Sequence, residues 1–176
     1  MVEVKTVHYA QDITAIGVIS DTHIPSRGRF IPPEVFRLFE GVQLILHAGD
    51  LVDEKIIEEL NVLAPVEAVA GNMDSALLQK KLGRVKLIKT GLFSIGLLHG
   101  DFLGRQADPE QLGAIFKPER PQAVVFGHLH KPVHKMYEGT LYFNPGSLID
   151  PRRSGKPTCG RLWVNGNSIE GEIISL

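Results

Sequence analysis

The chain has 176 residues, of which 43% are hydrophobic and 22% are charged, and its formal net charge at pH 7 is −1. This length and composition predict one globular domain, residues 1–176, and argue against an intrinsically disordered chain. The near-zero net charge argues against a general nucleic-acid surface or a membrane-binding surface, because both kinds of partner usually require a basic patch.

Cysteine usage and the apolar runs bear on the compartment. The single cysteine, Cys159, cannot form an intrachain disulfide, which fits a reducing environment. Residues 1–12 lack the continuous apolar stretch of a signal peptide. No apolar run approaches the ~20 residues needed to cross a bilayer. We therefore expect a soluble, cytoplasmic protein without a membrane partner.

The first part of the chain alternates short apolar runs with helical patterns. Residues 2–7 alternate in part and predict an additional edge strand. Apolar runs predict strands at 13–20, 42–46, 66–70, 92–98 and 123–126. Helices are expected between them, where proline or acidic residues open amphipathic segments, at 32–39, 53–63, 74–82 and 108–116.

From residue 123 onward, strands dominate. Further strands are expected at 133–137, 141–143, 160–164 and 169–174, and Asn165-Gly166 predicts a tight hairpin turn between the last two. Trp163, Phe36 and Phe39 are expected in the core. Alternating strands and helices followed by hairpins predict an α/β (α+β) fold. Its expected architecture is a four-layer αββα sandwich, with two stacked mixed β-sheets flanked by helices.

Polar motifs follow several of these expected strands. They are Asp21-Thr22-His23, Gly49-Asp50, Gly71-Asn72, His99-Gly100 and His128-Leu129-His130. In sheets built from strand-helix units, ligands gather in the loops beyond the strand ends, where glycines allow close backbone approach. Carboxylate, imidazole and amide groups without thiolate suit borderline divalent cations such as Mn, Fe, Co, Ni and Zn. A metal site is therefore the first hypothesis.

Each motif also has a structural interpretation when it is taken alone. Asp50 suits a helix cap, Asn72 a turn, and His99 a hydrogen-bonded histidine at a strand end. Short motifs out of context occur by chance in many proteins. The ordered series as a whole favours the metal site.

This series resembles that of the calcineurin-like metallophosphoesterases, especially the small prokaryotic phosphodiesterases of that superfamily, over residues 16–147. The resemblance implies two divalent metal ions, with Asp50 bridging both. Asp21, His23 and His130 would bind the first metal. Asn72, His99 and His128 would bind the second. Manganese is the first choice of metal, with Ni, Fe, Co or Zn as alternatives.

The resemblance also implies a reaction. A hydroxide bridging the two metals would attack phosphorus, with Asp50, Asn72 and His99 as the catalytic residues. Two divalent ions carry about four positive charges. Asp21 and Asp50 would offset two of them, leaving a pocket that attracts an anionic phosphoester. We expect a small, nucleotide-like substrate, selected by the loops around 24–30, 101–108 and 148–156.

Two positions depart from many members of the family. Met73 follows Asn72, where many members have a histidine that protonates the leaving group, although the small phosphodiesterases also tend to lack it and have aspartate at the position of Asp74. Because methionine donates no proton, good leaving groups should be favoured. Asp101 replaces a frequent histidine. Its role is open between a partner of the ligands, a proton handler and an exposed side chain.

Other polar residues near the motifs have two interpretations. We expect His47 to brace the loop before Asp50 rather than to bind metal. Residues 144–147 resemble a family loop beside the metal histidines, but a proline-glycine turn explains them equally well. Four basic residues could contact substrate phosphate, although surface cations are usually only solvated: Arg105, Arg152, Arg153 and Lys156.

The function predicted in this way is a metal-dependent phosphodiesterase. A phosphomonoesterase is one alternative, because the same machinery attacks either ester. A non-catalytic protein-binding scaffold resembling the retromer subunit is another, because that subunit has this fold but departs from the enzymatic ligand set. The presence of His23 and His130 argues against the scaffold. A homo-oligomer paired through an edge strand is compatible with the chain.

Overall fold

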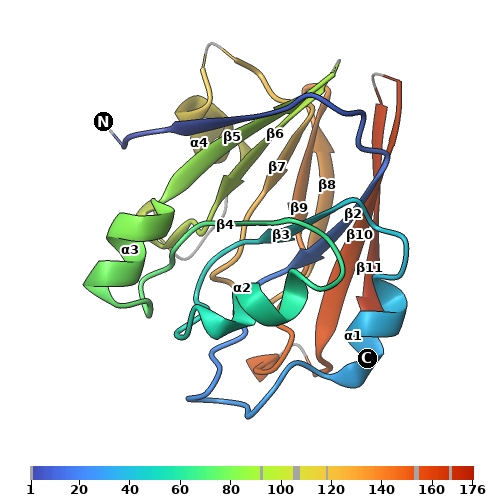
Figure 1. The fold of residues 1–176 in the computed structure, drawn as a ribbon. Helices are drawn as coiled ribbons and strands as arrows, with labels where there is room; N and C mark the ends of the chain where they lie inside the picture. Colours follow the sequence, from blue (N-terminus) through green and yellow to red (C-terminus); the bar gives the residue numbers. More distant parts are fainter. Residues whose placement is uncertain (1, 92, 105–107, 118, 153–154, 167) are drawn as a thin grey trace.

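The computed structural model describes residues 2–91, 93–104, 108–117, 119–152, 155–166 and 168–176. Two β-sheets pack against each other, and helices lie on their outer faces (Figure 1). This arrangement confirms the predicted four-layer sandwich of mixed sheets flanked by helices.

The first sheet has six strands in the order β1-β5-β6-β7-β9-β8. Their bounds are β1 Lys5–Tyr9, β5 Val85–Thr90, β6 Phe93–Leu98, β7 Ala123–Val125, β9 Thr140–Asn144 and β8 Val133–Tyr137. Strands β6, β7 and β9 are mutually parallel, whereas β5 pairs with β6, and β8 with β9, in antiparallel fashion. Because β6, β7 and β9 are parallel, their C-terminal ends lie at the same edge of the sheet.

The second sheet has five strands in the order β11-β10-β2-β3-β4. Their bounds are β11 Ser168–Ser175, β10 Thr158–Asn165, β2 Ala15–Ile19, β3 Leu44–His47 and β4 Val66–Ala68. Strands β2, β3 and β4 are parallel, and the β10–β11 hairpin is antiparallel and turns at the predicted Asn165-Gly166. Here too, three parallel strands end at a common edge.

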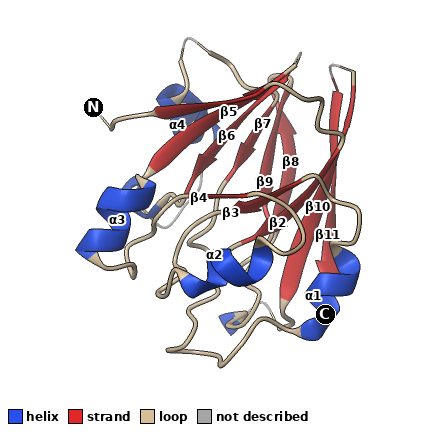
Figure 2. Ribbon diagram, in the orientation of Figure 1, coloured by secondary structure: helices blue, strands red, loops and turns tan. Residues whose placement is uncertain are grey.

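In the described part of the chain, four short α-helices cover the sheets (Figure 2): α1 Pro33–Leu38, α2 Lys55–Leu60, α3 Ala76–Leu82 and α4 Pro109–Ile115. Prolines occupy the first turns of α1 and α4, where a missing N–H costs nothing. The Ser75 side chain caps α3 by accepting from the Leu78 amide. A 3-10 turn, η1, spans Asp101–Leu103.

Three apolar clusters correspond to the three spaces between the four layers. The cluster between the sheets combines residues such as Val18 and Leu46 of one sheet with Ile95 and Val125 of the other. The outer face of the five-stranded sheet packs against α1, α2 and α3, and that of the six-stranded sheet against α4. The central strands of each sheet are therefore buried on both faces, which explains their continuous apolar runs.

Several sequence predictions need correction. Strand β5, Val85–Thr90, was not predicted, and it pairs with both β1 and β6. The helix predicted over 53–63 is shorter, because α2 begins at Lys55 and ends at Leu60. Trp163 is 38% exposed on β10, with the Arg161 guanidinium over its ring, and is not a core residue. Leu92 lies outside the described residues.

Contact between the sheets depends on small residues opposite one large ring. Phe143 of β9 is fully buried, and its ring lies against Gly160 of β10 and Gly171 of β11. A Cβ added at Gly171 would come within 2.8 Å of the ring, and one added at Gly160 would overlap it as well. The two sheets can approach this closely here because Gly160 of β10 and Gly171 of β11 have no side chain.

We expect Gly160→Ala to lower the free energy of unfolding by about 1–3 kcal/mol, because the added methyl overpacks the ring of Phe143. In a Phe143→Leu background the same change should cost less, because the smaller side chain leaves room. Urea unfolding of the two single variants and the double variant measures this coupling. Additive losses would show that the ring does not restrict this position.

Candidate metal centre

Each ligand motif follows a strand, as the sequence predicted. Asp21 and His23 follow β2, Asp50 follows β3, and Asn72 follows β4 in the five-stranded sheet. In the six-stranded sheet, His99 follows β6, and the segment 128–130 follows β7. The motifs therefore come from both sheets.

Hydrogen bonds connect these loops within and between the sheets. The Asp21 amide donates to the carbonyl of Gly49, and the His23 amide to that of Asp50, both at 3.0 Å. Across the sheets, the His128 amide donates to Asp21 Oδ2 at 3.1 Å. The Asp21 carboxylate is thus fixed by the backbone of a loop from the opposite sheet.

The backbone at the predicted ligands is strained. Positive φ angles occur at five of them: Asp21 (53°), His23 (47°), Asp50 (57°), His128 (69°) and His130 (54°). Non-glycine residues rarely adopt this left-handed conformation. Such strain persists where surrounding structure over-determines it, and it clusters at functional sites. Its concentration at these residues favours a site over five separate turns.

Two groups of side chains bring donor atoms together. Asp21, His23 and His130 form one group, and Asp21, Asp50 and His99 form the other, with the donor atoms of each group within 4.8 Å of one another. Asp50 Oδ2 lies 3.3 Å from His99 Nε2 and 3.6 Å from His23 Nε2. Asp50 therefore contacts a predicted ligand of each metal, which agrees with a bridging role.

Backbone carbonyl groups orient two of the histidine rings. His99 Nδ1 lies 2.7 Å from the carbonyl oxygen of Ala48, and His130 Nδ1 lies 2.5 Å from that of Asp150. Because a carbonyl only accepts, both Nδ1 atoms carry the proton and donate. The Nε2 atoms then face the cluster, and in the neutral rings they carry the lone pair that a metal ligand needs.

The donor set fits a divalent cation. Asp21 Oδ1 and His99 Nε2 are buried and make no hydrogen bond of acceptable geometry among the described residues, although His130 Nε2 lies 3.1 Å from the first atom and Asp50 Oδ2 lies 3.3 Å from the second. Buried polar atoms in native proteins nearly always have a partner, so unsatisfied ones call for a ligand. Imidazole and carboxylate donors suit Mn, Fe, Co, Ni and Zn. The identity of the metal is not fixed by this geometry.

The electrostatics of the cluster also favour a positive charge in it. Burial would raise the pKa of Asp50, but the His99 imidazole, the Met73 amide and His23 lower it to about 2. Burial disfavours protonated His99, yet its contacts with Asp50 and Asp21 raise its pKa to about 9. The carboxylates of Asp50 and Asp21 thus favour a positive charge at this position.

Two predicted ligands lie at the margin of the cluster. His128 is half-buried, with its ring centroid 5.3 Å from that of His99. Asn72 lies exposed in the turn after β4, next to Gly71, at which a Cβ would collide with the Asp50 carboxylate. The structure therefore brings His128 and Asn72 near Asp50 and His99, and their metal ligation stays a prediction.

Asp74 organises the loop that carries Asp50. Its buried carboxylate accepts hydrogen bonds from the amides of Asp50 (3.0 Å), Val52 (2.6 Å) and Gly71 (2.7 Å). Burial raises the pKa of Asp74, and the hydrogen bonds from Val52 and Gly71 oppose that rise. The sequence marked this position only through its place after Asn72. Its role is to join the loops that follow β3 and β4.

Asp101 is an ion-pair partner that connects two ligand loops. Both of its carboxylate oxygens bind the Arg84 guanidinium, which also donates to the Gly71 carbonyl at 3.0 Å. The loop after His99 is thereby joined to the loop before Asn72. Of the roles left open for Asp101, that of a partner of the ligand loops is the one observed. No motif in the sequence marks Arg84.

Other predicted neighbours occupy structural positions. His47 Nδ1 accepts from the Gly49 amide at 3.2 Å, and its Nε2 faces the Thr22 hydroxyl at 3.0 Å. Burial lowers the pKa of His47 to about 3, so the ring is neutral and braces the loop, as predicted. In the loop 144–147, the Ser147 hydroxyl donates to the Asp21 carbonyl at 2.8 Å.

Of the four basic residues considered as phosphate contacts, the two that the structure describes form no phosphate-binding site with one another. Arg152 pairs with Asp150 at 3.9 Å, and Lys156 is exposed. Arg105 and Arg153 lie outside the described residues.

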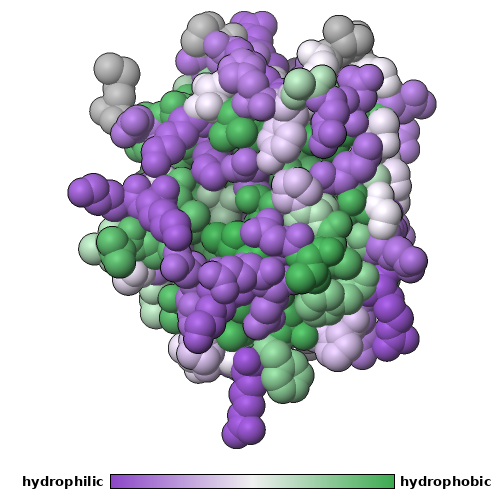
Figure 3. Space-filling view, viewed as in Figure 1, coloured by the Kyte–Doolittle hydropathy of each residue, from purple (hydrophilic) through white to green (hydrophobic). Residues whose placement is uncertain are grey.

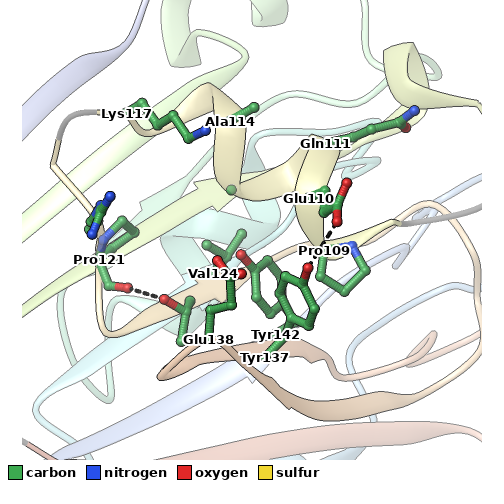
Figure 4. A pocket seen from close by; sticks show the side chains of 13 residues that line it. Pro109, Glu110, Gln111, Ala114, Lys117, Pro121, Val124, Tyr137, Glu138 and Tyr142 are labelled. Atoms are coloured by element: carbon green, nitrogen blue, oxygen red, sulfur yellow. Dashed lines mark hydrogen bonds between the residues drawn. The ribbon is translucent and has the colours of Figure 1, made fainter.

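The larger of two described cavities is remote from the predicted ligands. It has a volume of about 570 Å³ and lies between α4 and the strands β8 and β9. Figure 4 shows Glu110 of α4 facing Tyr137, with a hydrogen bond of 2.9 Å between them, and Tyr142 beside the same ring. None of the predicted ligands lines this cavity, so its size does not make it the chemical centre.

Comparisons with known proteins agree with one another. Residues 15–167 match the family model described as calcineurin-like phosphoesterase superfamily domain. A protein of Methanothermobacter thermautotrophicus named a probable metallophosphoesterase is 42% identical over 159 residues, which cover 90% of this chain and 91% of that relative. Another protein named in this way, from Methanocaldococcus jannaschii, is 38% identical over 137 residues, which cover 78% of this chain and 69% of the relative.

A solved structure supports the fold as well. Wild-type Vps29 of Entamoeba histolytica, complexed with Zn²⁺, is 28% identical and aligns with a TM-score of 0.74, covering 92% of this chain and 98% of that chain.

Within the described residues, no helix is long and apolar enough to cross a membrane.

We expect Asp74→Asn to weaken Mn²⁺ binding by about 10–100-fold, because residues that hold ligands in place affect metal affinity to this extent. The amide cannot accept from all of the amides that Asp74 satisfies, so the variant should also lose about 1–3 kcal/mol of stability. Calorimetric titration and urea unfolding measure the two effects. The matched control is Asp108→Asn, at an exposed helix cap where asparagine serves equally well. An unchanged Mn²⁺ affinity in Asp74→Asn would contradict this role.

Proposed function

The chain belongs to the calcineurin-like phosphoesterase superfamily, whose members are metal-dependent phosphoesterases, and from this premise we propose that it hydrolyses phosphodiester bonds with two divalent metal ions. The observation that carries the proposal is the buried cluster of Asp21, His23, Asp50, His99 and His130, with its unsatisfied donor atoms. The expected substrate is a small phosphoester, nucleotide-like in its chemistry.

The metals would be held by residues from both sheets. Asp21, His23 and His130 would bind the first, Asn72, His99 and His128 the second, and Asp50 both. When bound, the ions supply Lewis-acid polarisation of the phosphoester and make water acidic enough to act as a nucleophile. Manganese is our first choice. Nickel, iron, cobalt and zinc are alternatives, and zinc is the ion bound by the Vps29 relative.

The chain's own residues orient the reaction rather than transfer protons to the leaving group. Met73 follows Asn72 in the sequence, and its amide binds Asp50 Oδ1 at 2.8 Å, but its side chain donates no proton. The Asp101 carboxylate is engaged by Arg84. Substrates whose leaving groups need no protonation should therefore react fastest.

Charge near the site favours a diester over a monoester. A monoester dianion carries more negative charge than a diester and should require an additional cation. Three arginines near the ligand loops are already paired: Arg84 with Asp101, and Arg27 and Arg152 with Asp150. A phosphomonoesterase is the alternative within the enzyme class. A higher kcat/KM for p-nitrophenyl phosphate than for bis-p-nitrophenyl phosphate would favour it.

A protein-binding scaffold is the alternative outside the enzyme class, and the likeness to Vps29 structures supports it at the level of fold. Residues able to bind metal stand at the predicted ligand positions, and a strained backbone presents them. Both observations favour an enzyme over a scaffold. A cytoplasmic location, self-association through an edge strand and the lack of a general nucleic-acid surface stay predictions.

The primary test is hydrolysis of bis-p-nitrophenyl phosphate by metal-stripped protein, with Mn²⁺, Ni²⁺, Co²⁺, Zn²⁺ or Mg²⁺ restored separately. We expect turnover to return with at least one ion, and Asp50→Asn to reduce it by at least about 100-fold through loss of a ligand shared by both metals. Release of p-nitrophenolate gives the rate.

Asp108→Asn serves as the control for the removal of one carboxylate away from the cluster, and it should retain turnover. Circular dichroism of each variant without metal establishes that it is folded. If metal binds to the wild-type protein but no ion restores turnover, the scaffold becomes the better hypothesis.

A further inference from the structure

A second cavity lies between the N-terminal ends of α2 and α3 and has a volume of about 410 Å³. Its apolar lining comes from Pro25, Val52, Leu77 and Leu78. Leu77 of α3 is 78% exposed, and Figure 3 shows hydrophobic surface on that helix among hydrophilic neighbours. Leu77 thus presents an accessible aliphatic side chain at the rim of the cavity.

The cavity is built by the segments that carry predicted metal ligands. Pro25 lies two residues after His23, and Val52 two residues after Asp50. A β-bridge pairs Ile24 with Val52, so these two segments lie side by side as they leave the cluster. Two lining residues thus each lie two positions after a predicted ligand, so the cavity adjoins the loops that carry the ligands.

Val52 is held in an unfavourable conformation at this place. Its φ is 78°, a genuine outlier for a β-branched residue. Asp74 maintains it by accepting the Val52 amide at 2.6 Å, with the same carboxylate that fixes the Asp50 and Gly71 amides. The lining of the cavity and the presentation of Asp50 thus depend on one buried group, which links the cavity to the site rather than to general packing.

The charges around the cavity select against a second anionic group. Glu54 is paired with Lys81 at 2.5 Å, and Asp53 adds a carboxylate whose Oδ1 accepts the Lys55 amide. Two carboxylates and one ammonium group leave a net negative lining. A phosphate placed here would be repelled, whereas an uncharged group would be stabilised by the apolar side chains.

We propose that this cavity binds the uncharged organic group of the phosphoester substrate, an aromatic or similarly flat apolar group, while the phosphate lies at the metal centre. The inference rests on the proposed function and adds the class of substrate to it. Leu77 and Val52 would be specificity-determining residues. The sequence predicted substrate selection by the loops 24–30, 101–108 and 148–156. Of the described residues that line this cavity, only Pro25 belongs to one of these loops.

The test compares two phosphonate methyl esters, whose methoxide leaving group is too poor for ready hydrolysis without a proton donor. Methyl benzylphosphonate and methyl ethylphosphonate each carry the single negative charge of a phosphodiester and differ in the organic group, so the ratio of their Kd values isolates the contribution of the ring. Calorimetry on the Mn²⁺-loaded protein gives both values without relying on turnover. We expect methyl benzylphosphonate to bind about tenfold more tightly, as burial of part of a phenyl ring would produce.

Two variants of Leu77 and one matched control locate the effect. Leu77→Glu should bring the Kd ratio close to one, and Leu77→Ala should reduce it about threefold through loss of apolar contact alone. The control is Val62→Glu, at an aliphatic residue 76% exposed outside the cavity, and it should keep the ratio of the wild-type protein. Charge added by glutamate affects both phosphonates and cancels in the ratio.

The outcomes separate the inference from the function on which it rests. Equal affinities for the two phosphonates in the wild-type protein, or a ratio unchanged in both Leu77 variants, would overturn the cavity assignment and leave the phosphoesterase intact. Failure of both phosphonates to bind the Mn²⁺-loaded protein, together with no hydrolysis of bis-p-nitrophenyl phosphate, would overturn the proposed function and the cavity assignment with it.

Discussion

The candidate site depends on one buried carboxylate that binds backbone instead of metal. Asp74 satisfies the amides of Asp50, Val52 and Gly71, which belong to loops that leave different strands. Without these hydrogen bonds the left-handed conformations at Asp50 and Val52 would have little to hold them. A single acceptor thereby fixes the predicted bridging ligand, the close approach of Gly71 to it, and one wall of the neighbouring cavity.

The site is also a product of the contact between two sheets. Asp21 and Asp50 come from the five-stranded sheet, and His99 and His130 follow strands of the six-stranded sheet. Neither sheet contributes a complete set of donors. The hydrogen bonds of His99 to Ala48 and of the His128 amide to Asp21 cross this boundary. The apolar packing that sets the distance between the sheets, including Phe143 against the glycines of β10 and β11, therefore also sets the distances among donors.

Much of this arrangement was predictable, because each polar motif lies shortly after its own strand in the sequence. Apolar runs followed by Gly49-Asp50 or Gly71-Asn72 predict both a strand and the polar group that follows it. Strand β5 was missed because Lys86 and Lys89 interrupt its apolar pattern and no motif follows it. Arg84 escaped prediction for a different reason: its partners Asp101 and Gly71 are distant in sequence, and only the fold brings them together. Trp163 was wrongly placed in the core because β10 is half-exposed near its end.

The long separation in sequence between donors has a consequence for how the protein acquires its ion. His23 Nε2 and His130 Nε2 lie 3.2 Å apart although 107 residues separate them, and the Ser147 hydroxyl reaches back to Asp21 across 126 residues. During synthesis, a nascent chain that still lacks β7 and the segment after it offers only part of the donor set. High affinity for metal should thus arise last, after both sheets have docked, and an ion would stabilise only the finished molecule.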